Sequence, residues 1–156
     1  MDKMPMSVVL LGSIPEAILM AWAGFLLLEV RPPLKKVILV GILQGFTSYY
    51  IRRYIDFGPH IWAHLGTFIF YSYLIIRANL FTTTLAVIIP FALVILVEGP
   101  MLIFGNVNIA YLLSTEWERL LFFIPHDILL GAIIYICLKK DISLIKEFTF
   151  LKKFVG

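Results

Sequence analysis

Long apolar segments separated by short polar ones dominate the pattern of this chain. Five of them, at residues 7–30, 35–50, 60–76, 85–104 and 116–138, are interrupted mainly by proline, glycine and charged residues. A helix needs about 20 mostly apolar residues to cross a bilayer. The pattern therefore predicts an all-α, polytopic membrane protein, with five transmembrane helices forming a bundle over residues 1–140.

The last stretch, residues 141–156, has a different pattern. Leu144, Phe148, Leu151 and Val155 recur at helical spacing, and Lys146 lies elsewhere around the turn. Such a segment is typical of an amphipathic helix at a membrane surface. We expect a cytoplasmic amphipathic tail.

Composition supports this class. Of the 156 residues, 61% are hydrophobic, whereas soluble domains are about 45–50% apolar. One cysteine, Cys137, excludes a disulfide framework. The net charge of +3 gives no support for nucleic-acid binding, so the bilayer is the partner that the composition indicates.

The basic residues predict the orientation. In the five-helix arrangement, nine lysines and arginines flank the helices on the side of the C-terminus, and four flank them on the other side. Because cytoplasmic flanks carry the excess of positive charge, we expect the N-terminus outside and the C-terminus in the cytoplasm, in the cell membrane. An arrangement with four spans and one re-entrant helix would divide the basic groups between the two sides.

Two local signals concern helix packing and helix ends. Gly41 and Gly45 are four residues apart, which lets a neighbouring helix approach closely. The hydroxyls of residues 82–84, all threonine, could cap the start of the fourth helix. Pro90 and the sequence Glu98-Gly99-Pro100 are expected to break that helix.

Ionisable residues inside the predicted helices all fall in the outer half of the membrane. Buried charges cost several kcal/mol unless they pair or face water, so residues at one depth are expected to meet around a polar, outward-facing pocket. The candidate ligand-binding residues are Glu16, Arg52, Arg53, His60, His64, Glu98, His126 and Asp127.

Structural roles compete with ligand binding at each position. Glu16 could pair with an arginine and only fix helix packing, and His60 could serve a helix start. Glu98 could belong to a proline kink. Adjacent helical residues point about 100° apart, so only one of His126 and Asp127 is expected to face the pocket.

Enzymatic and metal chemistry have weaker support. Histidines and carboxylates are suitable zinc ligands, and His60 and His64 are four residues apart, but no glutamate follows the first as the HExxH motif requires. Cys137 lies about 16 Å along the helix from His126, too far for a thiol–imidazole pair. We expect no catalytic residues, no metal and no cofactor.

Three short motifs carry a resemblance. They are Ser13-Ile14-Pro15-Glu16, an arginine at 52 or 53 that ends the second span, and Phe57-Gly58-Pro59-His60. With them the chain resembles, over about residues 7–140, the membrane-integral sensory region of bacterial sensor histidine kinases of the GHKL type. The phosphoacceptor hairpin and the ATP site have no counterpart here, so the resemblance implies a free-standing sensory module.

These observations favour a non-enzymatic membrane protein that binds a small molecule in its outward-facing pocket and signals to a cytoplasmic partner or to a second copy in a homodimer. Two alternatives remain open. One is the substrate-binding subunit of a small-solute transporter, which usually has six spans rather than five. The other is a small membrane enzyme acting on lipid, with Glu98 or His126 as the base.

Overall fold

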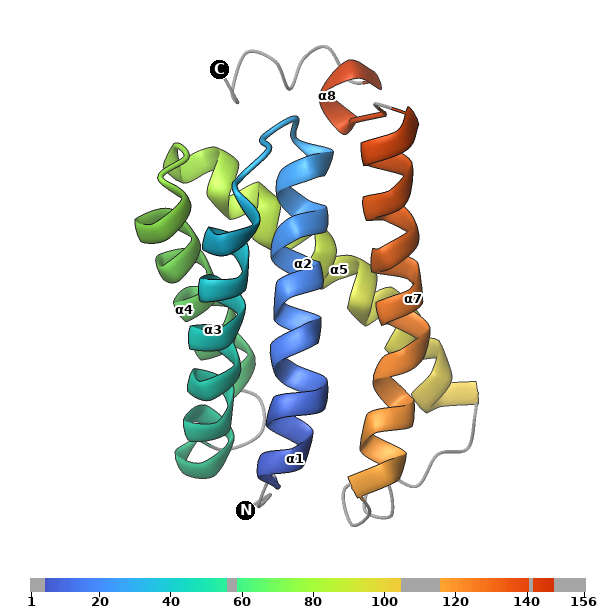
Figure 1. The fold of residues 1–156 in the computed structure, drawn as a ribbon. Coiled ribbons are helices and arrows are strands. Elements are labelled where there is room, and N and C mark those ends of the chain that lie inside the picture. Colours follow the sequence, from blue (N-terminus) through green and yellow to red (C-terminus); the bar gives the residue numbers. More distant parts are fainter. Residues whose placement is uncertain (1–4, 56–58, 105–115, 141, 148–156) are drawn as a thin grey trace.

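The computed structural model describes residues 5–55, 59–104, 116–140 and 142–147, and it is helical without strands over these residues. This confirms the prediction of an all-α protein. Figure 1 shows the arrangement. The elements in order are α1 (Met6–Val8), the π-helical segment η1 (Val9–Ser13), α2 (Ile14–Leu27), α3 (Leu34–Tyr54), α4 (Pro59–Ile76), α5 (Leu80–Phe104), α7 (Glu116–Lys140) and α8 (Leu144–Glu147).

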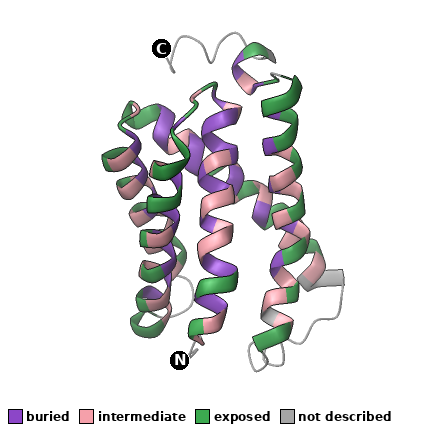
Figure 2. Ribbon diagram, in the orientation of Figure 1, coloured by how far each residue is buried: buried purple, intermediate pink, exposed green. Residues whose placement is uncertain are grey.

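One continuous helix, made of α1, η1 and α2, occupies the centre. It packs against α3, α5 and α7, and α4 packs on the far side of α3. The central helix is buried or half-buried along most of its length, whereas the outward faces of α3, α4 and α7 are exposed (Figure 2). Its apolar side chains, such as Ala21 and Phe25, form the main core together with Val40 and Leu130. The central helix therefore holds the bundle together.

Glycines set the closest helix contacts. A Cβ on Gly41 would collide with Ile18, and a Cβ on Gly45 would collide with the side chain of Ile14 and lie 3.2 Å from its Cα. The predicted close approach at these two glycines is thus confirmed, and the neighbouring helix is α2. Gly24 plays the same part on another face of α2, where it meets the backbone of α5.

The end of α2 is closed by a residue with a positive φ. Glu29 has φ 58°, its N–H donates to the Leu26 carbonyl, and the N–H of Val30 donates to the Phe25 carbonyl at 2.9 Å. This is the Schellman arrangement, in which glycine is the usual residue at the left-handed position. Here a glutamate occupies it, and its carboxylate accepts a hydrogen bond of 2.9 Å from the Ser143 hydroxyl.

The start of α5 differs from the expectation. Asn79 Oδ1 accepts the N–H of Thr82 at 2.6 Å, so asparagine is the cap and the helix begins at Leu80. The hydroxyls of Thr83 and Thr84 donate to carbonyls four residues earlier instead. The capping role expected for the threonines is therefore wrong. The helix also continues through Pro90 and Pro100, which were expected to break it.

Among the described residues, three helices are long and apolar enough to cross a membrane: the central one at Met6–Leu27, Leu80–Met101 in α5, and Glu116–Lys140. Two of the five predicted spans do not reach this measure of length and composition, and the number of spans stays a prediction. The segments in α3 and α4 fall short because each carries polar residues, such as Lys35 and Lys36 in α3 and His60 and His64 in α4.

The outward surface of these helices is apolar. Leu11 of η1 is 65% exposed, Leu96 of α5 67% and Ile128 of α7 66%. In water such surface would be unfavourable at about 25 cal/mol per Å², whereas lipid accommodates it. This agrees with the prediction of a membrane protein.

The C-terminal tail is described only in part. Its helix α8 is four residues long, and Ile145 within it is buried. Residues 148–156, which include Phe148, Leu151 and Val155 of the predicted apolar stripe, lie outside the described residues. The amphipathic tail stays a prediction.

Candidate functional site

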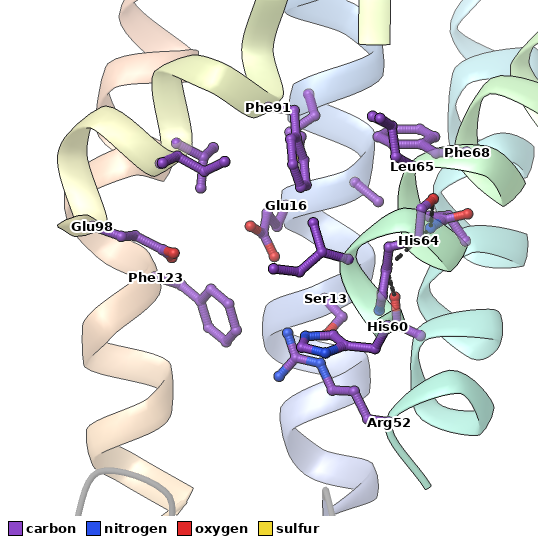
Figure 3. A pocket seen from close by; sticks show the side chains of 17 residues that line it. Ser13, Glu16, Arg52, His60, His64, Leu65, Phe68, Phe91, Glu98 and Phe123 are labelled. Atoms are coloured by element: carbon purple, nitrogen blue, oxygen red, sulfur yellow. Dashed lines mark hydrogen bonds between the residues drawn. The ribbon is translucent and has the colours of Figure 1, made fainter. Parts of the chain in front are cut away.

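A cavity of about 210 Å³ lies beside the central helix, among η1, α2, α3, α4, α5 and α7 (Figure 3). Most of its wall is apolar and includes the rings of Phe68, Phe91 and Phe123. Its polar lining residues are Ser13, Glu16, Gln44, Ser48, Arg52, His60, His64 and Glu98. Five of the residues predicted from the sequence thus line the cavity, and His126 is in direct contact with two of the lining residues.

The acidic side of the cavity centres on His126. This side chain is fully buried between two carboxylates from different helices: Nε2 lies 3.3 Å from Glu16 Oε1, and Nδ1 lies 3.3 Å from Glu98 Oε1. Neither ring nitrogen makes a hydrogen bond of acceptable geometry within the described part of the chain. Phe123, one turn earlier on α7, stacks edge-on against the imidazole with the ring centroids 5.7 Å apart. The imidazole is therefore confined between three neighbouring groups.

Asp127 lies at the edge of this group. Its Oδ1 is 3.8 Å from His126 Nε2 and is buried without a hydrogen bond within the described residues. It does not line the cavity. His126 is thus the member of the pair that turns inward, as expected for adjacent residues on one helix.

The basic side comes from α3 and α4. The amide of Gln44 donates to the backbone carbonyl of His64 at 3.1 Å, and its Nε2 lies 3.2 Å from His64 Nδ1. Ser48 Oγ is also 3.2 Å from Nδ1, and the Thr67 hydroxyl is 3.2 Å from Gln44 Oε1. These bonds fix the ring of His64 and join the two helices. His60, one turn earlier, meets His64 edge-on at 6.2 Å.

The two arginines at the end of α3 diverge. Arg52 lines the cavity and reaches into it near the start of α4 (Figure 3). Arg53 is exposed, donates from Nη1 to the Tyr49 hydroxyl at 3.2 Å and lies over the ring of Tyr54 at 5.9 Å from its centroid. Arg52 alone of the pair belongs to the cavity, and the ligand-binding role predicted for Arg53 has no geometric support.

Sequence reasoning missed Gln44 and the three phenylalanines. The sequence does indicate that Gln44 belongs to the site. Polar residues recur every four positions at Gln44, Ser48 and Arg52, so they share one face of a helix. The phenylalanines carry no such signal, since aromatic residues are common throughout the apolar segments.

The comparisons with known proteins found no matching family model, no matching curated protein and no matching solved structure. The site must therefore be interpreted from its own chemistry. It places the carboxylates of Glu16 and Glu98 toward one side and the nitrogens of Arg52, His60 and His64 toward the other, with aromatic rings in the wall (Figure 3). Such a cavity can hold a small molecule with charged or polar ends and an apolar middle.

Proposed function

We propose that this protein is a non-enzymatic membrane receptor that binds a small molecule in this cavity and passes the change to the cytoplasmic side. One observation carries the proposal. Five helices each direct a polar or charged residue toward the same cavity. The cavity is lined by Glu16, Gln44, His64 and Glu98, and His126 lies beside it in contact with the two glutamates. Core packing alone does not require such residues, because an apolar core of the same shape costs less free energy.

The size of the cavity limits the ligand. Its volume of about 210 Å³ is below the ~300–1,000 Å³ typical of drug-sized sites. The proposed ligand is therefore a small solute, or one end of a longer amphipathic molecule. Carboxylates on one wall and Arg52 on the other favour a ligand with both a cationic and an anionic or hydrogen-bonding group.

We further propose that α3 and α4 also cross the membrane, which gives five spans. At about 1.5 Å per residue, the 21 residues of α3 reach about the ~30 Å of the hydrocarbon core. Several polar groups of the two helices bond to each other, as Gln44 does to His64 and Thr47 Oγ does to the Tyr71 hydroxyl at 2.9 Å. Lys35 and Lys36 lie in the first turn of α3, where their long side chains can reach the membrane surface. The orientation remains N-terminus outside, because the basic flanks of Arg31, Lys35 and the C-terminus then face the cytoplasm.

The resemblance to the sensory region of histidine kinases stays a proposal, and we infer from it that its motifs belong to the proposed ligand site. Four residues of the motifs that carry it, Ser13, Glu16, Arg52 and His60, all line the cavity. Phe57 and Gly58 lie outside the described residues.

A route to the cytoplasmic side is present in the central helix. Glu16 lies in its first turns at the cavity, and Glu29 follows its last turn and holds the C-terminal segment through Ser143 and through Lys146 Nζ at 3.7 Å. A rigid helix that shifts when the cavity is occupied would move both ends together. The proposed reader is a cytoplasmic partner or a second copy of this chain.

A deletion strain tests the proposal against its rivals. The strain would be complemented with wild-type protein, with Glu98→Gln or with Glu118→Gln, a matched change near the start of α7 and outside the cavity. A receptor predicts that a restricted set of transcripts changes on deletion and is restored by the wild type and Glu118→Gln but not by Glu98→Gln. Altered membrane lipids would indicate an enzyme, altered solute uptake would indicate a transporter subunit, and either result with unchanged transcripts would refute the receptor.

A further inference from the structure

We propose that Glu16, Glu98 and His126 form a binding site for one divalent transition-metal ion of the Zn²⁺ class. The sequence predicted no metal, because its only histidine pair at metal-ligand spacing is His60 and His64. The structure brings together a different set from three helices. One possible ligand atom of each residue lies within 4.8 Å of the others.

The three side chains are close enough to share one metal ion. Zinc binds imidazole nitrogen and carboxylate oxygen at about 2.0–2.1 Å in a tetrahedron, which separates neighbouring ligand atoms by about 3.3 Å. The candidate ligand atoms of Glu16, Glu98 and His126 lie within 4.8 Å of one another, so a small inward movement of the side chains would bring them to that spacing around one ion. A histidine ligand coordinates through one nitrogen and donates its N–H to a carboxylate from the other. If Nδ1 of His126 coordinates the ion, Nε2 can donate its N–H to Asp127, whose Oδ1 lies 3.8 Å away, and Glu16 and Glu98 remain available as ligands.

Charge balance supports the same conclusion. Two carboxylates and a third from Asp127, 3.8 Å from His126 Nε2, are gathered around an imidazole whose exposed fraction is 0%. A protonated imidazole supplies a single positive charge. A divalent cation bound by neutral His126 would balance the two negative charges of Glu16 and Glu98, which leaves only Asp127 at the edge of the group, and a low-dielectric interior tolerates such a balanced group better than unpaired carboxylates.

The site is open on one side. Glu16 and Glu98 line the cavity, whereas His126 lies behind them. Three protein ligands leave a fourth tetrahedral position, and zinc sites with such a vacancy bind water or a ligand atom there. The metal would therefore present its open position to the cavity and coordinate an oxygen or nitrogen atom of the molecule bound there. This inference stands apart from the receptor proposal, since a metal could bind here in a protein of any function.

The test uses full-length protein in detergent, stripped with EDTA and dialysed. Equilibrium titration with Zn²⁺ alone, with bound metal measured by mass spectrometry, is expected to show one ion per chain. Loss of a residue that only supports a metal ligand weakens metal binding about 10–100-fold. A larger loss, of more than about 100-fold, is expected when a ligand itself is replaced, as in Glu98→Gln or His126→Gln. The control Glu118→Gln should bind as the wild type does. No binding to the wild type, or binding unchanged in both cavity variants, would overturn the proposal.

X-ray absorption spectroscopy of the zinc-loaded wild type keeps the test decisive if a variant fails to fold. The proposed site predicts a single imidazole, with oxygen atoms as the remaining ligands. Two imidazoles would place the ion at His60 and His64, and sulfur would place it at Cys137. Either spectrum would refute the assignment. Failure here leaves the receptor proposal intact, because the transcript experiment does not depend on the metal.

Discussion

Replacement of Gly24 by alanine tests the contact between α2 and α5 that holds Glu16 and Glu98 in register. A Cβ at Gly24 would overlap the Ala86 carbonyl oxygen and lie 2.7 Å from its carbon and 2.9 Å from Pro90 Cγ. Carbon atoms prefer separations of about 3.5–4.0 Å, so the helices must separate by roughly 1 Å. The obstacle is mainly backbone, which cannot rotate away.

The expected magnitude follows from two opposing terms. Overpacking costs about 1–3 kcal/mol, and the upper part of that range applies because α5 must move as a unit. Exchange of glycine for alanine within a helix recovers about 1 kcal/mol. The net loss is about 2 kcal/mol, which lowers the ratio of folded to unfolded protein about 30-fold.

Gly66→Ala is the matched control. Nothing lies within 4 Å of a Cβ placed on Gly66, so this variant keeps the propensity gain without the collision and should be up to about 1 kcal/mol more stable. Unfolding in mixed micelles with increasing SDS, followed by circular dichroism, measures both variants. If Gly24→Ala proves as stable as Gly66→Ala, the close approach of α2 and α5 is wrong.

Three further predictions concern other contacts. Gln44→Leu removes the amide that donates to His64 and should cost about 1–3 kcal/mol in the same SDS titration; an unchanged midpoint would show that the amide bond adds nothing. Glu29→Ala releases the C-terminal segment, so limited trypsin digestion should cleave that segment faster than in the wild type, and equal rates would contradict the contact. Reporter fusions after Asn106 should be active outside the cell and fusions after Lys140 inside; activity of both on one side would exclude five spans.

Much of the helical arrangement follows from the sequence because prolines and charged residues end the apolar segments. The predicted third span begins within one residue of α4, Pro59–Ile76. The start of the fourth was set five residues too late, because the cap is Asn79 and the threonines of the first turn were taken for it. Which of several neighbouring polar residues caps a helix depends on the backbone geometry, and the sequence does not show that geometry.

The candidate site could be predicted in part, from depth. Polar residues at one depth in a small bundle tend to contact one another, because lipid offers them no hydrogen-bond partner. The contacts of His126 with Glu16 and Glu98 agree with that reasoning. The facing of each helix could not be predicted, so Arg52 and Arg53 were both retained and Gln44 was overlooked. Whether these residues bind a ligand stays a prediction.

The π-helical segment η1 has a consequence for the spacing between the start of the chain and the cavity. A π turn holds an extra residue compared with an α turn, and each residue of an α-helix turns the face by about 100°. Deletion of one residue between Val9 and Ser13 could thus be absorbed as ordinary α-helix, with the facing of both α1 and Glu16 unchanged. In a helix without the bulge, the same deletion would rotate α1 by about 100° relative to Glu16. Natural or engineered length changes are therefore expected to be tolerated in η1 and not in α2.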